Sequence, residues 1–142
     1  MIGLDTNVLA RYYVAGADAD GADPATEDQR QAARALIESG RPLFLPKTVS
    51  LELEWVLRGY YRFPVADVLR VFEHLLSLES LTLEDRPCQE QAVAGLRSGL
   101  DFADALHHAS CRSCDLIASF DDKGFARRIQ RLNLQPKVLL PS

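Results

Sequence analysis

The stretch Ile2-Gly3-Leu4-Asp5-Thr6-Asn7-Val8-Leu9 joins a short apolar segment to the start of a helix through an aspartate. We interpret residues 2–4 as a buried strand and residues 6–14 as the helix that follows it. A carboxylate beside apolar residues is costly to bury, so Asp5 needs either a partner or a function. Aspartate is also a favoured helix N-cap, and that ordinary role is compatible in geometry with a functional one.

Short apolar segments alternate with helical segments along the remainder of the chain. We expect strands at 2–4, 42–46, 81–83, 116–119 and 137–140, and helices at 6–14, 26–39, 48–61, 65–77, 87–98, 102–112 and 123–132. Residues 15–25 are rich in Gly, Ala and Asp and predict a polar loop. Strands separated by helices predict a parallel sheet covered by helices, here as one domain over residues 1–142.

The composition is typical of a globular protein. Of the 142 residues, 47% are hydrophobic and 25% are charged. No apolar run approaches the ~20 residues that a membrane span needs, and Met1 leads into an apolar strand rather than a basic leader, which predicts a cytoplasmic protein. Three cysteines cannot all pair, so a disulfide framework is not expected.

The formal net charge of −4 does not exclude a nucleic-acid partner. From Arg112 onward, six basic residues stand against three acidic ones, so the C-terminal part is basic. The distribution of charge decides nucleic-acid binding more than its total does.

Three further acids lie in or beside apolar stretches, at Glu52, Asp104 and Asp121. Glu52 is three residues after Val49, at the edge of an apolar helix face, whereas we expect Glu54 to be solvated. This pattern favours Glu52 as the functional acid of the pair.

The other two acids each have an acidic neighbour. Asp101 and Asp104 are three residues apart and share one helix face, with Asp104 as the preferred ligand and Asp101 as an N-cap or helper. Asp121 closely follows the predicted strand 116–119, and we expect Asp122 to cap the next helix.

Ligands of parallel sheets bind beyond the carboxyl ends of the strands, where the strand order reverses. Asp5 follows the first strand and Asp121 the fourth, so they would face one crevice if those strands were neighbours. Clusters of carboxylates hold hard divalent cations such as Mg²⁺ or Mn²⁺. Metal-dependent phosphodiester chemistry is therefore the leading hypothesis.

Taken together, four segments resemble the PIN-domain nucleases, most closely the VapC-type toxins of bacterial type II toxin–antitoxin systems. These segments are Leu4-Asp5-Thr6-Asn7-Val8-Leu9, Glu52-Leu-Glu54-Trp55-Val-Leu57-Arg58, Asp101-Phe-Ala-Asp104-Ala-Leu106 and Ser119-Phe-Asp121, and the resemblance covers nearly the whole chain. It implies a three-layer α/β/α sandwich with a five-stranded parallel sheet in which the first and fourth strands are adjacent. It further implies Mg²⁺- or Mn²⁺-dependent ribonuclease activity, a homodimer, and inhibition by a small VapB-type antitoxin.

The same resemblance assigns roles to particular residues. The catalytic and metal-binding acids would be Asp5, Glu52, Asp104 and Asp121. Asn7 and Ser119 would support the site, and Ser119 stands where the family more commonly has threonine. Asp101 is a further supporting candidate.

Two alternative functions remain open. A small-molecule phosphohydrolase of the haloacid-dehalogenase kind would need a second aspartate two positions after Asp5, where Asn7 stands. A degenerate PIN domain would bind RNA or protein without cleaving, although all four acids are present.

Other motifs have ordinary explanations. Cys111 and Cys114 have the spacing of a redox pair or half a zinc site, yet no second ligand pair accompanies them, and we interpret them as buried or incidental thiols. We expect His107 and His108 to be surface or packing residues. The aromatic-rich helix around Trp55 is the predicted interface for the dimer or the antitoxin.

Overall fold

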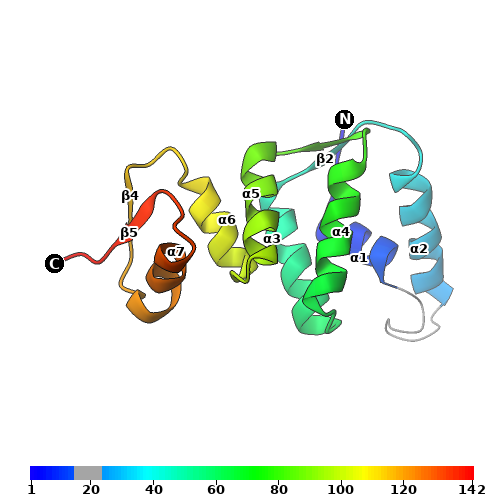
Figure 1. The fold of residues 1–142 in the computed structure, drawn as a ribbon. Coiled ribbons are helices and arrows are strands. Elements are labelled where there is room, and N and C mark those ends of the chain that lie inside the picture. Colours follow the sequence, from blue (N-terminus) through cyan, green and yellow to red (C-terminus); the bar gives the residue numbers. More distant parts are fainter. Residues whose placement is uncertain (15–23) are drawn as a thin grey trace. The chain divides into compact units, whose positions relative to one another are not determined.

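The computed structural model describes residues 1–14 and 24–142, where parallel strands and helices alternate (Figure 1). The predicted loop at 15–25 therefore falls, for residues 15–23, outside the described residues. The chain divides into an N-terminal unit, Met1–Arg86, and a C-terminal unit, Pro87–Ser142. The α/β class predicted from the sequence is confirmed.

The strands are β1 (Ile2–Gly3), β2 (Leu43–Leu45), β3 (Leu81–Leu83), β4 (Leu116–Ala118) and β5 (Lys137–Leu139). The helices are α1 (Thr6–Tyr13), α2 (Pro24–Ile37), α3 (Lys47–Trp55), α4 (Val65–Ser77), α5 (Arg86–Arg97), α6 (Phe102–Ser110) and α7 (Arg127–Arg131), with π-helical turns η1 (Val56–Tyr60) and η2 (Asp122–Ala126). None of the helices in this described part of the chain is both long and apolar enough to cross a membrane.

The N-terminal unit contains a parallel sheet with the strand order β1-β2-β3. Leu43 and Leu45 of the central strand point to the same face of the sheet and are completely buried, whereas Phe44 on the other face is half-buried. Helix α4 buries Val68, Val71, Phe72 and Leu75, an i, i+3, i+4, i+7 stripe. Helix α1 packs against α2 and α3, and α4 packs against β3.

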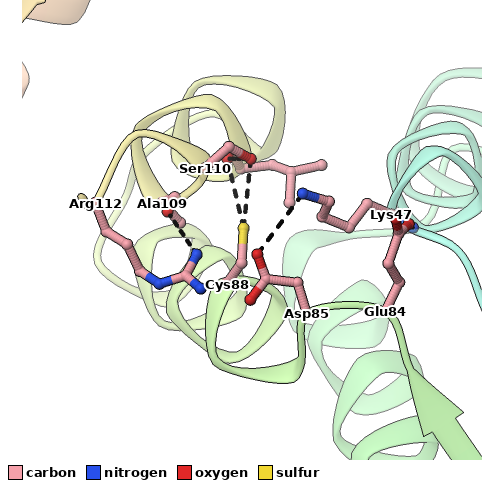
Figure 2. Close-up of polar contacts among 8 residues, drawn as sticks. Lys47, Glu84, Asp85, Cys88, Ala109, Ser110 and Arg112 are labelled. Carbon is pink, nitrogen blue, oxygen red and sulfur yellow. Dashed lines mark hydrogen bonds and ion pairs between the residues drawn. The ribbon is translucent and has the colours of Figure 1, made fainter. Parts of the chain in front are cut away.

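Two contacts of Lys47 tie the start of α3 to the end of β3 (Figure 2). The backbone N–H of Lys47 donates to Glu84 Oε1 at 2.8 Å, and Lys47 Nζ lies 3.7 Å from Asp85 Oδ2. The first N–H groups of a helix lack acceptors within the helix, and an acid at that end also favours the helix dipole. Glu84 therefore caps α3 from another element and fixes the start of the helix that carries Glu52.

The predicted helix 48–61 is in fact α3 followed by η1. The turn is closed by the Tyr61 N–H, which donates to Val56 O at 3.0 Å. The prediction that Thr26 begins a helix is also wrong, because α2 begins at Pro24 and Thr26 is buried in its first turn. Proline suits the first position of a helix, where its missing N–H costs nothing.

The C-terminal unit contains the parallel pair β4-β5, against which η2 and α7 pack. Helices α5 and α6 approach closely at Gly95, where a Cβ atom would lie 2.7 Å from Ala105 Cβ. Buried Cys88 of α5 lies 3.4 Å from Ser110 Oγ of α6 (Figure 2). The absence of a side chain at Gly95 thus sets the position of α6, which carries Asp104.

Candidate functional site

Asp5 lies directly after β1 and is the N-cap of α1. Its Oδ1 accepts the backbone N–H of Thr6 at 2.8 Å, so the predicted capping role is confirmed. A carboxylate can accept about four hydrogen bonds, so this bond leaves Asp5 the capacity to bind a cation. Its position beyond the carboxyl end of a parallel strand is where ligands of such sheets bind.

Glu52 is exposed on α3, whereas Glu54 is buried at 2% exposure. The prediction that Glu54 is solvated is therefore wrong. The buried residues of α3 and η1 are Ser50, Leu53, Glu54 and Leu57. Glu54 thus lies on the buried face of the helix, whereas the apolar residues Val49 and Val56 are only half-buried. Arg58 Nε donates to Glu54 Oε1 at 2.6 Å and compensates the buried charge.

Asn7 is exposed on the first turn of α1. It lines, with Val8 and Arg11, one side of a groove of about 270 Å³ between α1 and α2. The helix α1 also packs against α3, so the elements that carry Asp5 and Glu52 belong to one packed group.

In the C-terminal unit, Asp104 on α6 is surrounded by charged groups. Partial burial raises the pKa of its carboxyl, and the negative charges of Asp101 and Asp121 raise the pKa further. Arg128 and His107 act in the opposite direction, and Arg128 NH1 lies 3.9 Å from Asp104 Oδ2. The acids predicted in this unit thus lie within each other's electrostatic influence.

Asp121 is the N-cap of η2. Its two carboxylate oxygens accept the N–H groups of Gly124 at 2.9 Å and Phe125 at 3.2 Å. Its own N–H donates to Ser119 Oγ at 3.1 Å. Asp122 lies inside the first turn, so the prediction that Asp122 is the cap is wrong.

Gly124 is needed for this arrangement, because a Cβ there would lie 2.7 Å from both oxygens of Asp121. Because Gly124 has no side chain, the Asp121 carboxylate can accept both N–H groups at the start of η2, and these two hydrogen bonds hold it in one orientation. Asp101 precedes α6 as its N-cap without a side-chain capping bond, so its carboxylate is not committed to that role.

The donors suit a hard divalent cation in their chemistry. They are carboxylate oxygens. Partial burial and then the negative charges of Asp101 and Asp121 raise the pKa of Asp104, and a bound cation would remove the part of this cost that is due to repulsion. Within neither unit, over residues 1–14 and 24–142, do three His, Cys, Asp or Glu side chains form a group that could hold a metal ion. Two of the candidate acids belong to each unit, Asp5 and Glu52 to the first and Asp104 and Asp121 to the second.

Sequence reasoning missed Arg128 as a neighbour of Asp104. Nothing in the local sequence predicts this contact, which joins residues on two different helices. The histidines behave as expected: His108 is buried with its Nε2 2.9 Å from Pro136 O, and exposed His107 contacts the ring of Phe125.

The aromatic helix is only partly buried. Leu53 and Leu57 are completely buried, but the side chains of Trp55 and Tyr60 remain 61% and 60% exposed. Of the predicted interface residues on α3 and η1, Trp55 and Tyr60 are therefore exposed, whereas Leu53 and Leu57 belong to the core.

Comparison of the sequence with known proteins shows which family the chain belongs to. The PIN domain family model matches residues 2–130. The chain is also similar to a VapC ribonuclease from Aquifex aeolicus (strain VF5), with 26% identity over 134 residues that cover 93% of this chain and 92% of that protein. A match over this share of the sequence shows that the chain belongs to the PIN domain family.

Proposed function

We propose that this protein is a Mg²⁺- or Mn²⁺-dependent ribonuclease and the toxin of a VapBC-type toxin–antitoxin pair in the cytoplasm. The observation that carries the proposal is the crowding of carboxylates around Asp104, in a chain that belongs to the PIN domain family. Crowded acids are retained where they have a function, because their repulsion otherwise costs stability. Similarity to a VapC ribonuclease supports RNA as the substrate.

In this proposal β1 and β4 lie side by side in one five-stranded parallel sheet of a single domain over residues 1–142. The sheet would form the central layer of an α/β/α sandwich. Asp5 and Asp121 would then lie at neighbouring strand ends and face one site, together with Glu52 and Asp104.

Asp5, Glu52, Asp104 and Asp121 would hold the cation. When bound, a divalent ion supplies a more acidic water and neutralises charge on the phosphodiester oxygens. Asp5 accepts a backbone N–H as a helix cap, whereas Glu52 is exposed within its helix and has no such capping role. The Glu52 carboxylate would therefore orient the attacking water by accepting a hydrogen bond from that water. Ser119 holds the backbone of Asp121, which keeps the carboxylate in place before substrate binds.

Arg128 would contribute to substrate binding. In the C-terminal unit its guanidinium lies beside Asp104, and cation binding at that carboxylate would release it toward a phosphate. Arg127 and Arg131 on the same helix are exposed and extend the basic surface.

The antitoxin and dimer assignments are supported by α3 and η1. Trp55 and Tyr60 present apolar surface that the N-terminal unit does not need for its own core. An antitoxin segment bound there would carry an arginine toward the acids, because a guanidinium pairs well with carboxylates.

The deciding experiment is cleavage of single-stranded RNA by the purified chain with Mg²⁺, with Mn²⁺ and with a chelator. We expect cleavage with either metal and none with the chelator. RNA binding without cleavage would instead identify a degenerate binding module, and hydrolysis of small phosphomonoesters alone would identify a phosphohydrolase.

The toxin assignment has a separate test. The chain is expressed alone and together with the open reading frame directly upstream, and growth and complex formation are measured. We expect growth arrest by the chain alone and rescue by a bound neighbour. A harmless chain that remains monomeric and does not bind that neighbour would refute the toxin assignment but not the ribonuclease.

A further inference from the structure

Three arginines converge on a pocket between the end of α1 and the first half of α2. Among the residues that the structure describes, Arg11, Arg30 and Arg34 line this cavity of about 440 Å³, together with one acid, Glu27. All of these residues belong to the N-terminal unit, and none of them is part of the proposed acid site. The cationic lining exceeds the anionic lining, which favours an anionic ligand.

Arg30 is the central group of this arginine pocket. Its side chain is only 12% exposed, and its NH1 lies 3.2 Å from Glu27 Oε2. Its Nε and NH2 atoms are buried without a hydrogen-bond partner among the described residues. Buried donors of a charged group nearly always have an acceptor, so these two atoms require an oxygen that the described residues do not supply, either from water or from a ligand.

The other two arginines are also incompletely neutralised by their own contacts. Arg11 Nε donates to the neutral amide oxygen of Gln29 at 2.9 Å, a bond that leaves its positive charge in place. Arg34 lies 4.0 Å from Glu38, at the outer limit of an ion pair, and 69% of its side chain is exposed. Glu38 also accepts a hydrogen bond from the Tyr12 hydroxyl at 3.1 Å.

A phosphate group matches these donors better than a planar carboxylate does. The donors come from two helices and therefore approach the pocket from different directions. A tetrahedral phosphate presents several oxygens at once, and the guanidinium fork pairs with two of them.

We propose that the arginine pocket binds a phosphate group, which is supplied either by an RNA backbone or by a small phosphate compound. The RNA source rests on the proposed ribonuclease function, whereas phosphate binding itself does not. Arg11 lines both this pocket and the neighbouring groove that contains Asn7, and both cavities lie along α1. Six residues of helix between Asp5 and Arg11 span about 9 Å, a distance that a few nucleotides of one strand can cover.

Phosphate binding is tested by thermal melting in inorganic phosphate against sodium chloride of equal ionic strength, with Arg30→Gln and Arg11→Gln beside the parent. The control variant is Arg70→Gln, because Arg70 also makes an i, i+3 ion pair, with Asp67 at 3.6 Å, but is 80% exposed on α4 outside the pocket. Phosphate stabilises most proteins slightly by exclusion from their surface, so the readout is the difference between parent and variant.

We expect the parent and Arg70→Gln to gain equally from phosphate, and the two pocket variants to lose most of that extra gain. If Arg30→Gln does not fold, Arg11→Gln decides the test alone, since Arg11 lies at the pocket edge. Equal gains in the parent and in every folded pocket variant would overturn the proposal.

The source of the phosphate is decided by binding of a labelled single-stranded RNA in chelator, where cleavage cannot occur. Loss of one phosphate contact should reduce the slope of log K against log salt by about 0.7. A reduced slope in Arg30→Gln and Arg11→Gln assigns the pocket to the RNA backbone. An unchanged slope, with the phosphate-dependent gain lost, assigns it to a small phosphate compound.

These readouts separate the two proposals. A parent protein that fails to cleave RNA with metal but still gains stability from phosphate through Arg30 would refute the ribonuclease and retain the pocket. If the parent cleaves RNA and the pocket variants gain as much stability from phosphate as the parent does, the ribonuclease proposal stands and the phosphate pocket is refuted.

Discussion

In the N-terminal unit the candidate acids Asp5 and Glu52 are exposed and stand on separate elements, whereas in the C-terminal unit Asp104 is partly buried among other charges. Asp5 has its charge balanced by the start of a helix, which favours an anion. Asp104 has Asp101 and Asp121 as neighbours, and both raise its pKa. In the C-terminal unit these neighbouring negative charges therefore add to the effect of partial burial on the Asp104 carboxyl.

The arginines show the opposite distribution. In the C-terminal unit Arg128 lies against an acid of the candidate site. In the N-terminal unit Arg11 and Arg30 line a pocket that holds more arginines than acids, and buried donors of Arg30 are unused by the described residues. Both units pair an arginine with one of their own carboxylates, Arg58 with Glu54 in the first and Arg128 with Asp104 in the second, and the N-terminal unit also contains the arginine pocket.

The largest expected effect comes from removing one acid in each unit. Asp5→Asn and Asp104→Asn should each lower RNA cleavage by about a hundredfold or more, because even indirect supports of metal ligands cost up to that factor. Both variants should also gain less thermal stability from Mg²⁺ than the parent. Asp115→Asn, an exposed acid in the C-terminal unit, is the control.

The Asp5→Asn and Asp104→Asn variants together test whether both units contribute acids to the site. If Asp104→Asn abolishes cleavage while Asp5→Asn retains it and responds to metal as the parent does, Asp5 does not belong to the site. The C-terminal unit would then hold the functional acids without the first strand.

The next effect concerns the basic helix of the C-terminal unit. Reversing Arg127, Arg128 and Arg131 to glutamate should weaken RNA binding by about tenfold or more and reduce the salt slope by about 2, since three phosphate contacts would be lost. The measurement is made in chelator. An unchanged slope would mean that these arginines form an ordinary solvated helix face.

Arg128 needs separate treatment because it also contacts Asp104. The double variant Arg127→Glu/Arg131→Glu leaves that contact intact. A slope reduced only in the triple variant would assign the phosphate contact to Arg128.

A smaller effect is expected from Gly124→Ala. The added Cβ would displace the Asp121 carboxylate, so cleavage should fall by about tenfold, as for other supports of metal ligands. Alanine is the better helix former, and this offsets part of the lost capping, so the melting temperature should change little. Full activity in Gly124→Ala would show that the orientation of Asp121 is not critical.

The smallest effect is a pH dependence of stability without metal. Because the pKa of Asp104 is raised in the folded state, the folded protein binds its proton more tightly than the unfolded chain does. The free energy of unfolding should therefore decrease as pH rises from the ordinary carboxyl pKa through the raised one. A third of the Asp104 side chain is exposed, so solvent weakens the effect.

The check is urea unfolding from acid to neutral pH in chelator, for the parent and for Asp104→Asn. The decrease in the free energy of unfolding that the Asp104 carboxyl causes should be absent in Asp104→Asn. At neutral pH this variant should be no less stable than the parent. A variant that is less stable at neutral pH would mean that the Arg128 contact outweighs the repulsion from Asp101 and Asp121.

Local pattern predicted the order of strands and helices because each element carries its own signal. The stretch from Ile2 to Leu9 contains a strand, a capping aspartate and a helix start in the predicted order. The strand is shorter and less buried than predicted, because β1 ends at Gly3, Gly3 is exposed and Ile2 is half-buried. The start of α2 was misplaced because Thr26 and Pro24 both carry helix-start signals, and the proline position prevailed.

Local sequence was sufficient to predict the α/β class and the acids at the ends of strands, because hydrophobic period and capping chemistry act between near neighbours. Long-range packing was needed to bury Glu54, to bring Arg128 beside Asp104, and to leave two donors of Arg30 without an acceptor among the described residues. A helix face is chosen by the elements packed against it, and a contact between two helices depends on their mutual approach. Those quantities arise from long-range packing, which no local spacing of residues encodes.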